Sequence, residues 1–498
     1  MSQIQIHNFS YTHEGAQSAL FDHVHFQIDS QWKLGFIGRN GRGKTSFLRC
    51  LLGELEFTGE IRHQVDFTYF PLEVKCRSDK TIKILEEQSN YQAQWMIERE
   101  LNLLNVNLAV LDQAFDTLSG GEQTKVLLAA LFLKPHAFLL IDEPTNHLDQ
   151  EARDAVANYL KAKEGFILVS HDRTLLNACV DHILVINKTD IEVQKGNFAS
   201  WWENKQHEDQ FELSQNEKLK KEAKRLKEAM LKTAEWSDDV EKSKYRSHNT
   251  KVNARESFDR GYIGHKSAKM MKRSKTIELR QSRALDQKKE LLKNVDENDA
   301  LKIQPLIYRQ NQIISFDKVT HHYDERKIFQ DLNFTLNQGD RLAIVGPNGS
   351  GKSTILNLIL GRLKQSEGII YQNKDLKISY VEQDANFLGG SLNRYIKAED
   401  CDEPLFKAIL RKMDFERTQF DIPMEKYSEG QKKKVLIAKS LSQSAHLYLW
   451  DEPLNFIDVL SRIQIEDLIL SYQPTMIFVE HDQTFVEKIA TKIINLSY

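Results

Sequence analysis

GRNGRGKTSF at residues 38–47 reappears in altered form as GPNGSGKSTI at residues 346–355. Both copies fit the pattern G-x-x-x-x-G-K-[ST], and each follows an apolar stretch that predicts a buried strand. In such a loop the glycines allow backbone N–H groups to wrap a polyphosphate at the start of a helix. One match alone could be a glycine-rich turn that fits by chance. Two copies in one chain favour a phosphate-binding loop in each half.

The two loops belong to a longer duplication. Matching positions keep a nearly constant spacing, from 308 residues between Lys44 and Lys352 to 310 residues between His171 and His481. In each half, apolar stretches alternate with helix-like or turn segments, a pattern typical of a mostly parallel sheet covered by helices. The sequence therefore predicts two similar α/β domains.

The segment between the halves, residues 203–300, has a different composition. It contains no Pro or Gly from Glu203 to Arg260, and its apolar residues recur at the a/d spacing of helical seams. This pattern predicts a linker of two long antiparallel helices with a tip at about residues 244–264. The predicted fold class is α/β: two nucleotide-binding domains, at 1–202 and 301–498, joined by an α-helical hairpin.

Bulk composition limits the classes of protein. No run of about 18 apolar residues occurs, and the start MSQIQIHNFS lacks the layout of a signal peptide, so we expect a cytoplasmic protein. The four cysteines form no C-x-x-C pair, which argues against a zinc site or a disulfide framework. Residues 211–300 hold 23 Lys and Arg against 16 Asp and Glu, whereas the whole chain has a net charge of −3. This basic segment suits a polyanionic partner.

The chemistry predicted for the two loops is the binding of ATP with Mg²⁺. Lys44 and Lys352 would neutralise phosphate oxygens, and the hydroxyl groups of Thr45 and Ser353 would ligate Mg²⁺. The predicted loop residues are Gly38, Asn40, Gly41, Gly43, Lys44 and Thr45 in the first half, and Gly346, Asn348, Gly349, Gly351, Lys352, Ser353 and Thr354 in the second.

Each half also contains an apolar strand that ends in two acids, in LLIDEP and LYLWDEP. Such a pair taken alone is often a solvated turn, but its spacing from the phosphate loop and the following Pro favour a catalytic role. Asp142 and Asp451 are predicted to hold Mg²⁺. Glu143 and Glu452 are predicted to orient or deprotonate the attacking water.

At LSGGEQ, residues 118–123, the sequence resembles the ATP-binding cassette family, of which this motif is the signature. In that family two nucleotide-binding domains pack head to tail, so each ATP lies between the phosphate loop of one and the signature of the other. Two loops are then needed because each half completes the site of the other. The resemblance implies further site residues: Ser119, Gly120, Gly121, Ser428 and Gly430 in the signatures, Tyr11 and Tyr323 for adenine stacking, Gln383 for sensing the γ-phosphate and metal, Asp149 and Asp458 in the interdomain loops, and His171 and His481 as switch histidines.

The two sites are predicted to be unequal. Aligning VDFTYFPLEV with LKISYVEQDA places Leu72 at the position of Gln383, and leucine cannot accept a hydrogen bond. In YSEGQ, Glu429 stands where LSGGEQ has Gly120, and a carboxylate aimed at a γ-phosphate is repulsive. Both changes fall in the site made by the first-half loop and the second-half signature (site 1), so we expect site 2, with the opposite pairing, to hydrolyse ATP faster. The alternative is that Glu429 turns to solvent and the sites differ little.

Two cassettes, a helical linker and no membrane span make the layout similar to that of the translation-associated ABC-F class. Within the linker, basic residues recur at three-residue steps, which gathers them on one helix face suited to RNA phosphates. A solvated coiled-coil face is the alternative reading. The residues are Lys266, Lys269, Lys272, Arg273 and Lys275.

Within ABC-F, the long linker, the lack of an inserted arm in the first cassette, the short C-terminal end and YSEGQKKKV resemble the antibiotic-resistance branch, in particular Lsa-type and also Vga-like proteins. The resemblance implies an ATPase that binds the ribosomal exit site in its ATP state, next to large-subunit rRNA and exit-site tRNA. Its linker would reach toward the peptidyl-transferase centre and displace lincosamides, streptogramin A and pleuromutilins. We expect a monomer that pairs its own cassettes. A housekeeping ABC-F translation factor and the ATPase motor of a multi-component drug exporter are the alternatives.

On this interpretation the linker tip would lie nearest the drug. Phe258 is the candidate for the deepest residue because a large apolar side chain in a polar turn has no obvious core to fill. The alternative is that Phe258 packs between the helices and braces the turn. Tyr245, Lys251 and Arg255 are candidates for stacking on RNA or contacting phosphates.

Overall fold

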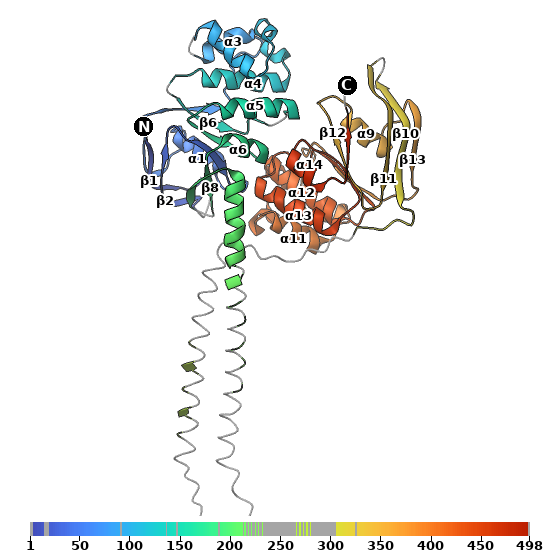
Figure 1. Ribbon diagram of the computed structural model, residues 1–498. Coiled ribbons are helices and arrows are strands. Elements are labelled where there is room, and N and C mark those ends of the chain that lie inside the picture. Colours follow the sequence, from blue (N-terminus) through green and yellow to red (C-terminus); the bar gives the residue numbers. More distant parts are fainter. Residues whose placement is uncertain are drawn as a thin grey trace, which may run out of the picture. The chain divides into compact units, whose positions relative to one another are not determined.

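The computed structural model describes residues 3–13, 19–89, 92–135, 137–145, 148–187, 190–212, 305–323 and 326–496, and isolated linker positions between 214 and 279 (Figure 1). The chain divides into two compact units, one formed by Met1–Trp201 with Ala300–Tyr498 and the other by Trp202–Asp299. The domain limits inferred from the sequence, at 202 and 300, stay a prediction.

A mostly parallel sheet lies at the centre of each half of the first unit (Figure 1). The first-half sheet has the order β5-β6-β7-β3-β8-β9, with only β8 and β9 antiparallel, and the second-half sheet has the order β14-β15-β16-β12-β17. The first-half strands are β3 (Lys33–Ile37), β5 (Asp66–Phe70), β6 (Ala137–Asp142), β7 (Phe166–Val169), β8 (His182–Ile186) and β9 (Ile191–Lys195). The second-half strands are β12 (Arg341–Val345), β14 (Ile378–Val381), β15 (Leu447–Asp451), β16 (Met476–Val479) and β17 (Lys492–Asn495).

A three-stranded antiparallel sheet accompanies each parallel sheet, in the orders β2-β1-β4 and β11-β10-β13. Its strands are β1 (Gln3–Tyr11), β2 (Phe21–Asp29) and β4 (Thr58–Arg62) in the first half, and β10 (Gln312–Tyr323), β11 (Arg326–Asn337) and β13 (Glu367–Gln372) in the second.

Helices cover the sheets and form a separate helical layer in each half (Figure 1). Those of the first half are α1 (Lys44–Leu51), α2 (Thr81–Gln88), α3 (Gln94–Leu103), α4 (Gly120–Phe132), α5 (Gln150–Lys161) and α6 (Arg173–Cys179), with the 3₁₀ turns η1 (Leu108–Asp112) and η2 (Phe115–Thr117). Those of the second half are α9 (Lys352–Ile359), α10 (Leu392–Ala398), α11 (Glu403–Lys412), α12 (Glu429–Ser442), α13 (Val459–Tyr472) and α14 (Gln483–Ile489), with η3 (Arg417–Asp421) and η4 (Met424–Lys426).

Burial explains why these stretches form central strands. All four residues of β7 and of β16 are buried, as expected for parallel strands with both faces covered. Phe47 on α1 is fully buried and packs edge-on against Phe9 of β1 and Phe36 of β3, at centroid distances of 5.6 Å and 5.5 Å. This aromatic contact fixes the helix that follows the first phosphate loop to both sheets at once.

The strand register places equivalent residues of the two halves. In the first half Phe70 pairs with Ile141, and in the second half Val381 pairs with Trp450, in each case one residue before the strand-end aspartate. Leu72 lies two residues after Phe70, and Gln383 lies two residues after Val381. The register therefore places Leu72 at the position of Gln383, as the sequence alignment predicted.

In the linker, the described positions from 202 to 232 and from 265 to 279 are helical. Lys269, Lys272 and Lys275 are exposed in the second of these helical stretches. The other linker residues singled out from the sequence, namely Tyr245, Lys251, Arg255, Phe258, Lys266 and Arg273, lie outside the described residues, as does the predicted hairpin tip. Within the described part of the chain, the structure contains no helix with the length and apolar character needed to cross a bilayer.

Candidate nucleotide-binding sites

Both phosphate loops end at a glycine in the left-handed region. Gly43 has φ 89° and caps α1, and Gly351 has φ 93° and caps α9. A side chain at Gly351 would place its Cβ 2.4 Å from Cγ2 of Ile328, so the position requires glycine. Each helix therefore begins at the lysine of its motif, and the unpaired N–H groups of its first turn form a site for an anion.

The two lysines turn back onto their own loops. Lys44 Nζ donates to the carbonyl oxygen of Gly38 at 2.7 Å, and Lys352 Nζ donates to that of Gly346 at 2.9 Å. Burial lowers the pKa of both ammonium groups, although nearby carboxylates oppose this effect. A triphosphate would supply the negative charge that carbonyl oxygens provide only weakly, so the geometry fits the predicted phosphate contacts.

The residues predicted to hold Mg²⁺ lie together in both halves. Thr45 Oγ1 donates to Asp142 Oδ2 at 3.0 Å, and Ser353 is hydrogen-bonded to Asp451. Asp451 Oδ1 is buried and has no hydrogen-bond partner among the described residues, and burial raises the pKa of this carboxyl to about 6. Hydroxyl and carboxylate oxygens are the ligands that Mg²⁺ prefers, and a cation there would satisfy the orphaned oxygen, so the residues fit the metal.

The two glutamates that follow these aspartates share an uncommon backbone conformation. Glu143 has φ 50° and Glu452 has φ 46°, in the left-handed region that costs a residue with a long side chain about 1 kcal/mol or more. Glu143 Oε1 lies 3.3 Å from His171 Nε2, and Glu452 Oε1 lies 3.4 Å from His481 Nε2. The structure therefore brings each predicted catalytic glutamate to its predicted switch histidine.

The surroundings of the two glutamates differ. Glu452 Oε2 accepts hydrogen bonds from Gln383 Nε2 and Asn455 Nδ2, both at 2.9 Å, whereas Leu72, at the position of Gln383, offers Glu143 no donor. Asn146, at the position of Asn455, lies outside the described residues. Burial and the charge of Asp142 raise the pKa of Glu143. Burial would also raise the pKa of Glu452, but hydrogen bonds from His481 and Gln383 outweigh it and lower that pKa to about 2. The donors around Glu452 thus favour its carboxylate form.

A cavity of about 410 Å³ opens at the second phosphate loop. Tyr323, one of the two tyrosines predicted to stack on adenine, is 45% exposed at its edge, whereas Tyr11 is only 7% exposed. A separate small cavity of about 10 Å³ lies behind the first phosphate loop, where its lining includes Phe36, Ser170 and Phe198. The larger cavity is lined by Leu148, Arg153, Tyr323, Ile328, Asn348, Gly349, Gly351, Lys352, Ser353, Thr354, Gln383, Glu452, Asn455 and His481.

The second half closes directly onto the first phosphate loop. Asn40 Nδ2 donates to Phe456 O at 2.6 Å, and Asn40 N donates to Asp458 Oδ2 at 3.4 Å. A Cβ on Gly430 of the second signature would lie 2.7 Å from Asn40 Nδ2. Site 1 is therefore assembled head to tail. In site 2 the cavity lining includes Leu148 and residues of the second loop, but not the first signature.

Both signatures begin a helix. The hydroxyl groups of Ser119 and Ser428 each accept a hydrogen bond from the backbone three residues on, at 3.3 Å, and a side chain returns the bond, which forms a capping box. The side chain of Glu429 is 46% exposed and lies 3.2 Å from Lys432 Nζ. The structure thus shows the alternative weighed from the sequence, in which this carboxylate turns away from the phosphate loop.

Sequence reasoning missed two residues that support Glu452. Asn455 binds its carboxylate, and Lys433 Nζ donates to the carbonyl oxygens of Gln383 at 2.6 Å and Glu452 at 3.3 Å. Lys433 belongs to the KKK run after the second signature, which resembles a solvated charge run, yet all three lysines are buried. The first half has Thr124 at the equivalent position. This difference between Thr124 and Lys433 is the sequence feature that could have pointed to a special role for Lys433.

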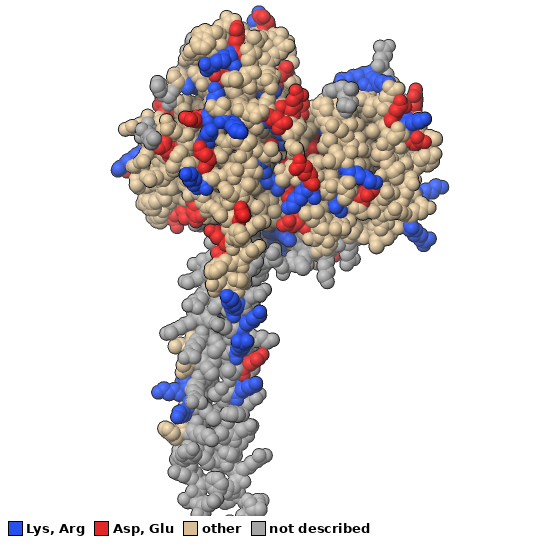
Figure 2. Space-filling view, viewed as in Figure 1, with Lys and Arg blue, Asp and Glu red and all other residues tan. Residues whose placement is uncertain are grey.

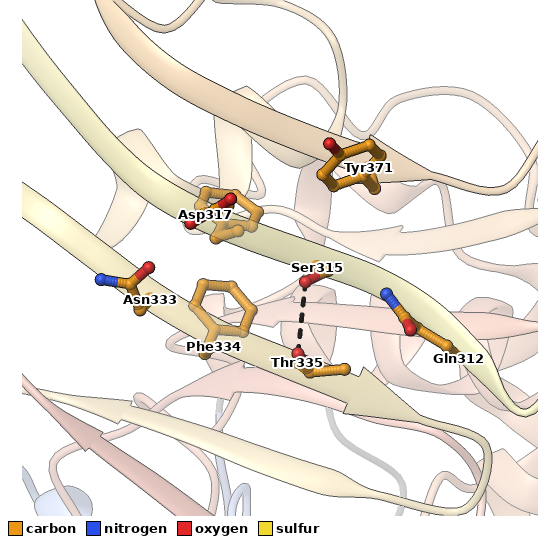
Figure 3. Close-up of a pocket in the computed structure, with 8 residues that line it drawn as sticks. Gln312, Ser315, Asp317, Asn333, Phe334, Thr335 and Tyr371 are labelled. Atoms are coloured by element: carbon orange, nitrogen blue, oxygen red, sulfur yellow. Dashed lines mark hydrogen bonds between the residues drawn. The ribbon is translucent and has the colours of Figure 1, made fainter.

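A second groove, of about 550 Å³, lies away from the phosphate loops on the antiparallel sheet of the second half (Figure 3). Its polar residues include Ser315 and Thr335, whose hydroxyl groups lie 3.2 Å apart, and Asp317. Ser315 and Thr335 satisfy each other across two strands.

Taken together, the paired phosphate loops, strand-end acids and switch histidines define two P-loop ATPase cassettes on one chain. The chain belongs to the ABC transporter family, whose sequence pattern matches residues 21–146 and 329–455. It is an ATP hydrolase, and the predicted α/β fold with two cassettes is confirmed.

Similar proteins extend across nearly the whole chain. The ribosome protection protein VmlR of Bacillus subtilis (strain 168) is 27% identical over 97% of this chain and 85% of its own length. The energy-dependent translational throttle protein EttA of Haemophilus influenzae is 25% identical over 93% of this chain and 86% of its own. These similarities confirm the resemblance to the ABC-F class. Among solved structures, the archaeal ribosome recycling factor aABCE1, in complex with the stalk protein aP1, has a TM-score of 0.62 at 18% identity and covers 98% of this chain and 87% of its own, which shows a shared fold.

Proposed function

We propose that this chain is a ribosome protection ATPase of the Lsa type, related also to Vga-like proteins. In its ATP state, with Mg²⁺ held by the loop hydroxyls and strand-end aspartates, it binds the ribosomal exit site next to large-subunit rRNA and exit-site tRNA. Its linker then extends toward the peptidyl-transferase centre and displaces lincosamides, streptogramin A and pleuromutilins. The observation that carries the proposal is the similarity to VmlR over 97% of the chain, linker included.

The charge of the linker supports an RNA partner. Its described positions Lys218, Lys221, Arg225, Lys232, Lys269, Lys272 and Lys275 are all exposed, and residues 211–300 hold 23 Lys and Arg against 16 Asp and Glu. Figure 2 shows basic side chains along the described part of the linker. Exposed ammonium and guanidinium groups bind phosphates without reading sequence, and their contribution to affinity falls as salt rises.

A variant that binds ATP without hydrolysing it gives the direct test. Glu143→Gln together with Glu452→Gln should keep the phosphate contacts and hold the cassettes in the ATP state. We expect this double variant to co-sediment with ribosomes when ATP is present, and to dissociate progressively across a salt series. The matched control is Lys44→Ala with Lys352→Ala, which should not pellet with ATP. Failure of the glutamate variant to pellet at low salt would reject the ribosome as its partner and favour the motor of a drug exporter.

The similarity to EttA supports a second candidate, a housekeeping role in translation. The two roles differ in their dependence on antibiotic. On ribosomes loaded with a labelled lincosamide, a protection factor should release the drug in the presence of ATP, whereas a housekeeping factor should leave it bound. Phe258→Ala then tests the linker tip: lost drug release with an unchanged melting temperature would support contact near the drug, and a lowered melting temperature would support a brace.

A further inference from the structure

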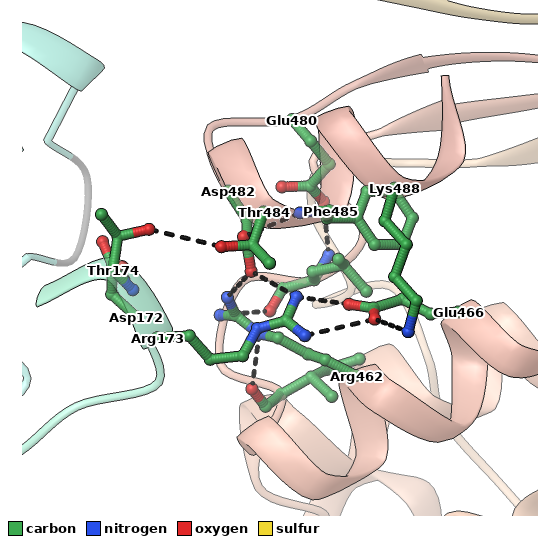
Figure 4. Close-up of polar contacts among 12 residues, drawn as sticks. Asp172, Arg173, Thr174, Arg462, Glu466, Glu480, Asp482, Thr484, Phe485 and Lys488 are labelled. Carbon is green, nitrogen blue, oxygen red and sulfur yellow. Dashed lines mark hydrogen bonds and ion pairs between the residues drawn. The ribbon is translucent and has the colours of Figure 1, made fainter. Parts of the chain in front are cut away.

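We propose that Arg173 is a positioning residue for site 2, and that it ties the catalytic turn of the second half to the switch-histidine loop of the first. The inference concerns ATP hydrolysis alone, so it holds whether or not the chain acts on ribosomes. Arg173 is the first residue of α6, two positions after His171. Its side chain is 7% exposed and extends among residues of the second half (Figure 4).

The guanidinium group of Arg173 contacts two buried carboxylates. It donates to both oxygens of Glu466, with Nη1 at 3.2 Å from Oε2, and its Nη2 lies 3.5 Å from Asp482 Oδ2. The side chains of Glu466 and Asp482 are 0% and 2% exposed. A two-pronged contact between buried ions fixes orientation as well as distance. Asp482 directly follows the switch histidine of the second half, so Arg173 joins the two switch loops.

From Asp482 the contacts continue to the catalytic turn of site 2. Arg462 Nη1 donates to Asp482 Oδ2 at 3.0 Å, and the same guanidinium donates to the carbonyl oxygens of Leu454 at 3.0 Å and Ile457 at 2.9 Å. These two carbonyls flank Asn455, whose side chain holds the carboxylate of Glu452. Figure 4 shows Arg173 and Arg462 meeting at the same aspartate.

In the opposite direction, from the second half to the first, neither residue of the Arg173–Glu466 pair has a charged counterpart. Gln483 stands where the first half has Arg173, and its amide donates within its own helix to Glu487 at 2.9 Å. Ala157 stands where the second half has Glu466. The equivalent residues Thr174 and Thr484 lie 3.4 Å apart, so corresponding surfaces of the two halves do meet here.

The framework around this link is otherwise duplicated. Arg153 donates to Leu148 O at 2.9 Å and lies 3.5 Å from Asp172, as Arg462 does with Ile457 and Asp482. The difference between the two halves therefore lies in Arg173 and its acceptor Glu466. Because separating a buried ion pair is costly in a low-dielectric interior, displacement of the first switch loop should displace Asp482, Arg462 and the turn that carries Glu452.

The test measures each site alone in the full chain. Removing only Arg173 would leave the buried carboxylate of Glu466 with the partly exposed Lys488 in place of its two-pronged contact, so the variant is Arg173→Gln with Glu466→Gln. In a Glu143→Gln background, where site 2 supplies the turnover, we expect this pair to lower kcat about tenfold to a hundredfold, the range for a displaced catalytic group. KM for ATP should stay within twofold because the phosphate loop is untouched. Arg173→Lys with Glu466 retained keeps the positive charge but not the two-pronged contact, so it should restore only part of the loss.

Two controls separate positioning from folding. In a Glu452→Gln background, which reports site 1, the same pair should change kcat less than twofold. Lys488→Gln removes a partly exposed cation that also donates to Glu466, at 3.0 Å, but it leaves both members of the Arg173–Glu466 pair in place, and it should leave site-2 kcat within twofold. Unchanged kcat at site 2 would overturn the proposal. Equal losses at both sites with a lowered melting temperature would also overturn it, because they would show a purely structural cluster.

Discussion

Site 1 and site 2 are built from the same duplicated elements, but they differ in the residues at the edge of the phosphate loop and around the catalytic glutamate. In site 1, Asn40 contacts the opposite interdomain loop. In site 2, the cavity is about 410 Å³ and Glu452 is held by hydrogen-bond donors. The comparison teaches that duplication supplies the framework, whereas a few unmatched residues decide which contacts each site makes.

One set of unmatched residues lies at the edge of the first loop. Arg39 Nη1 and Arg42 Nη2 lie 3.5 Å and 3.2 Å from the carboxylate of Asp414 in the second half. The equivalents in the other pairing are Pro347, Ser350 and Asn105, which cannot form an ion pair. Charge therefore favours closure of site 1 only.

The largest expected effect concerns the two catalytic glutamates, and it tests whether site 2 hydrolyses ATP faster than site 1. Glu452→Gln should reduce steady-state phosphate release about a hundredfold, within the range of about 10²–10⁴ for a general base, because site 2 holds this group ionised. Glu143→Gln should reduce it less than tenfold, since burial and Asp142 disfavour the ionised form of Glu143. The two single variants are assayed side by side. A larger loss for Glu143→Gln would refute the assignment of site 2 as the faster site.

The second prediction concerns a substitution that gives site 2 the residue found at the same position in site 1. Gln383→Leu copies Leu72 and removes a hydrogen bond to an ionised carboxylate, worth about 1.5–3 kcal/mol, so kcat should fall about tenfold. Loss of the donor also raises the pKa of Glu452 from about 2, because the donor had stabilised the charged form. The acidic limb of the pH–rate profile should therefore move to higher pH. The matched control, Leu72→Gln, should leave that limb in place, and a shift in the control instead would contradict the assignment.

The third prediction concerns closure of site 1. Arg42→Gln and Asp414→Asn each remove one member of an ion pair whose side chains are 24% and 20% exposed. Asparagine suits position 414, where φ is 60°. A double-mutant cycle on melting temperature should give a coupling of about 0.5–1 kcal/mol, or a few degrees at most. Additive effects of the two substitutions would mean that the pair does not hold the halves together.

Much of this arrangement could be predicted from the sequence because it depends on local patterns. The phosphate loops, the buried strands and the position of Leu72 opposite Gln383 follow from motif spacing and apolar runs. The contact of Arg173 with Glu466 could not be predicted, since the two residues are 293 positions apart and a single sequence does not give the register between two packed halves. The buried lysines after the second signature were missed for a similar reason: charge predicts exposure unless packing supplies buried acceptors.

The direction of one side chain gives the smallest expected effect. Glu429 opens α12, where φ/ψ is fixed by the capping box but the side chain can lie along the helix or toward the opposite loop. The structure shows it 46% exposed beside Lys432, and a solvated pair three residues apart contributes only about 0.5 kcal/mol. Glu429→Gln should therefore change phosphate release in the Glu452→Gln background less than twofold. A tenfold gain there would show that the carboxylate swings onto the γ-phosphate once ATP is bound, and that repulsion at this position, in addition to the missing glutamine, keeps site 1 slow.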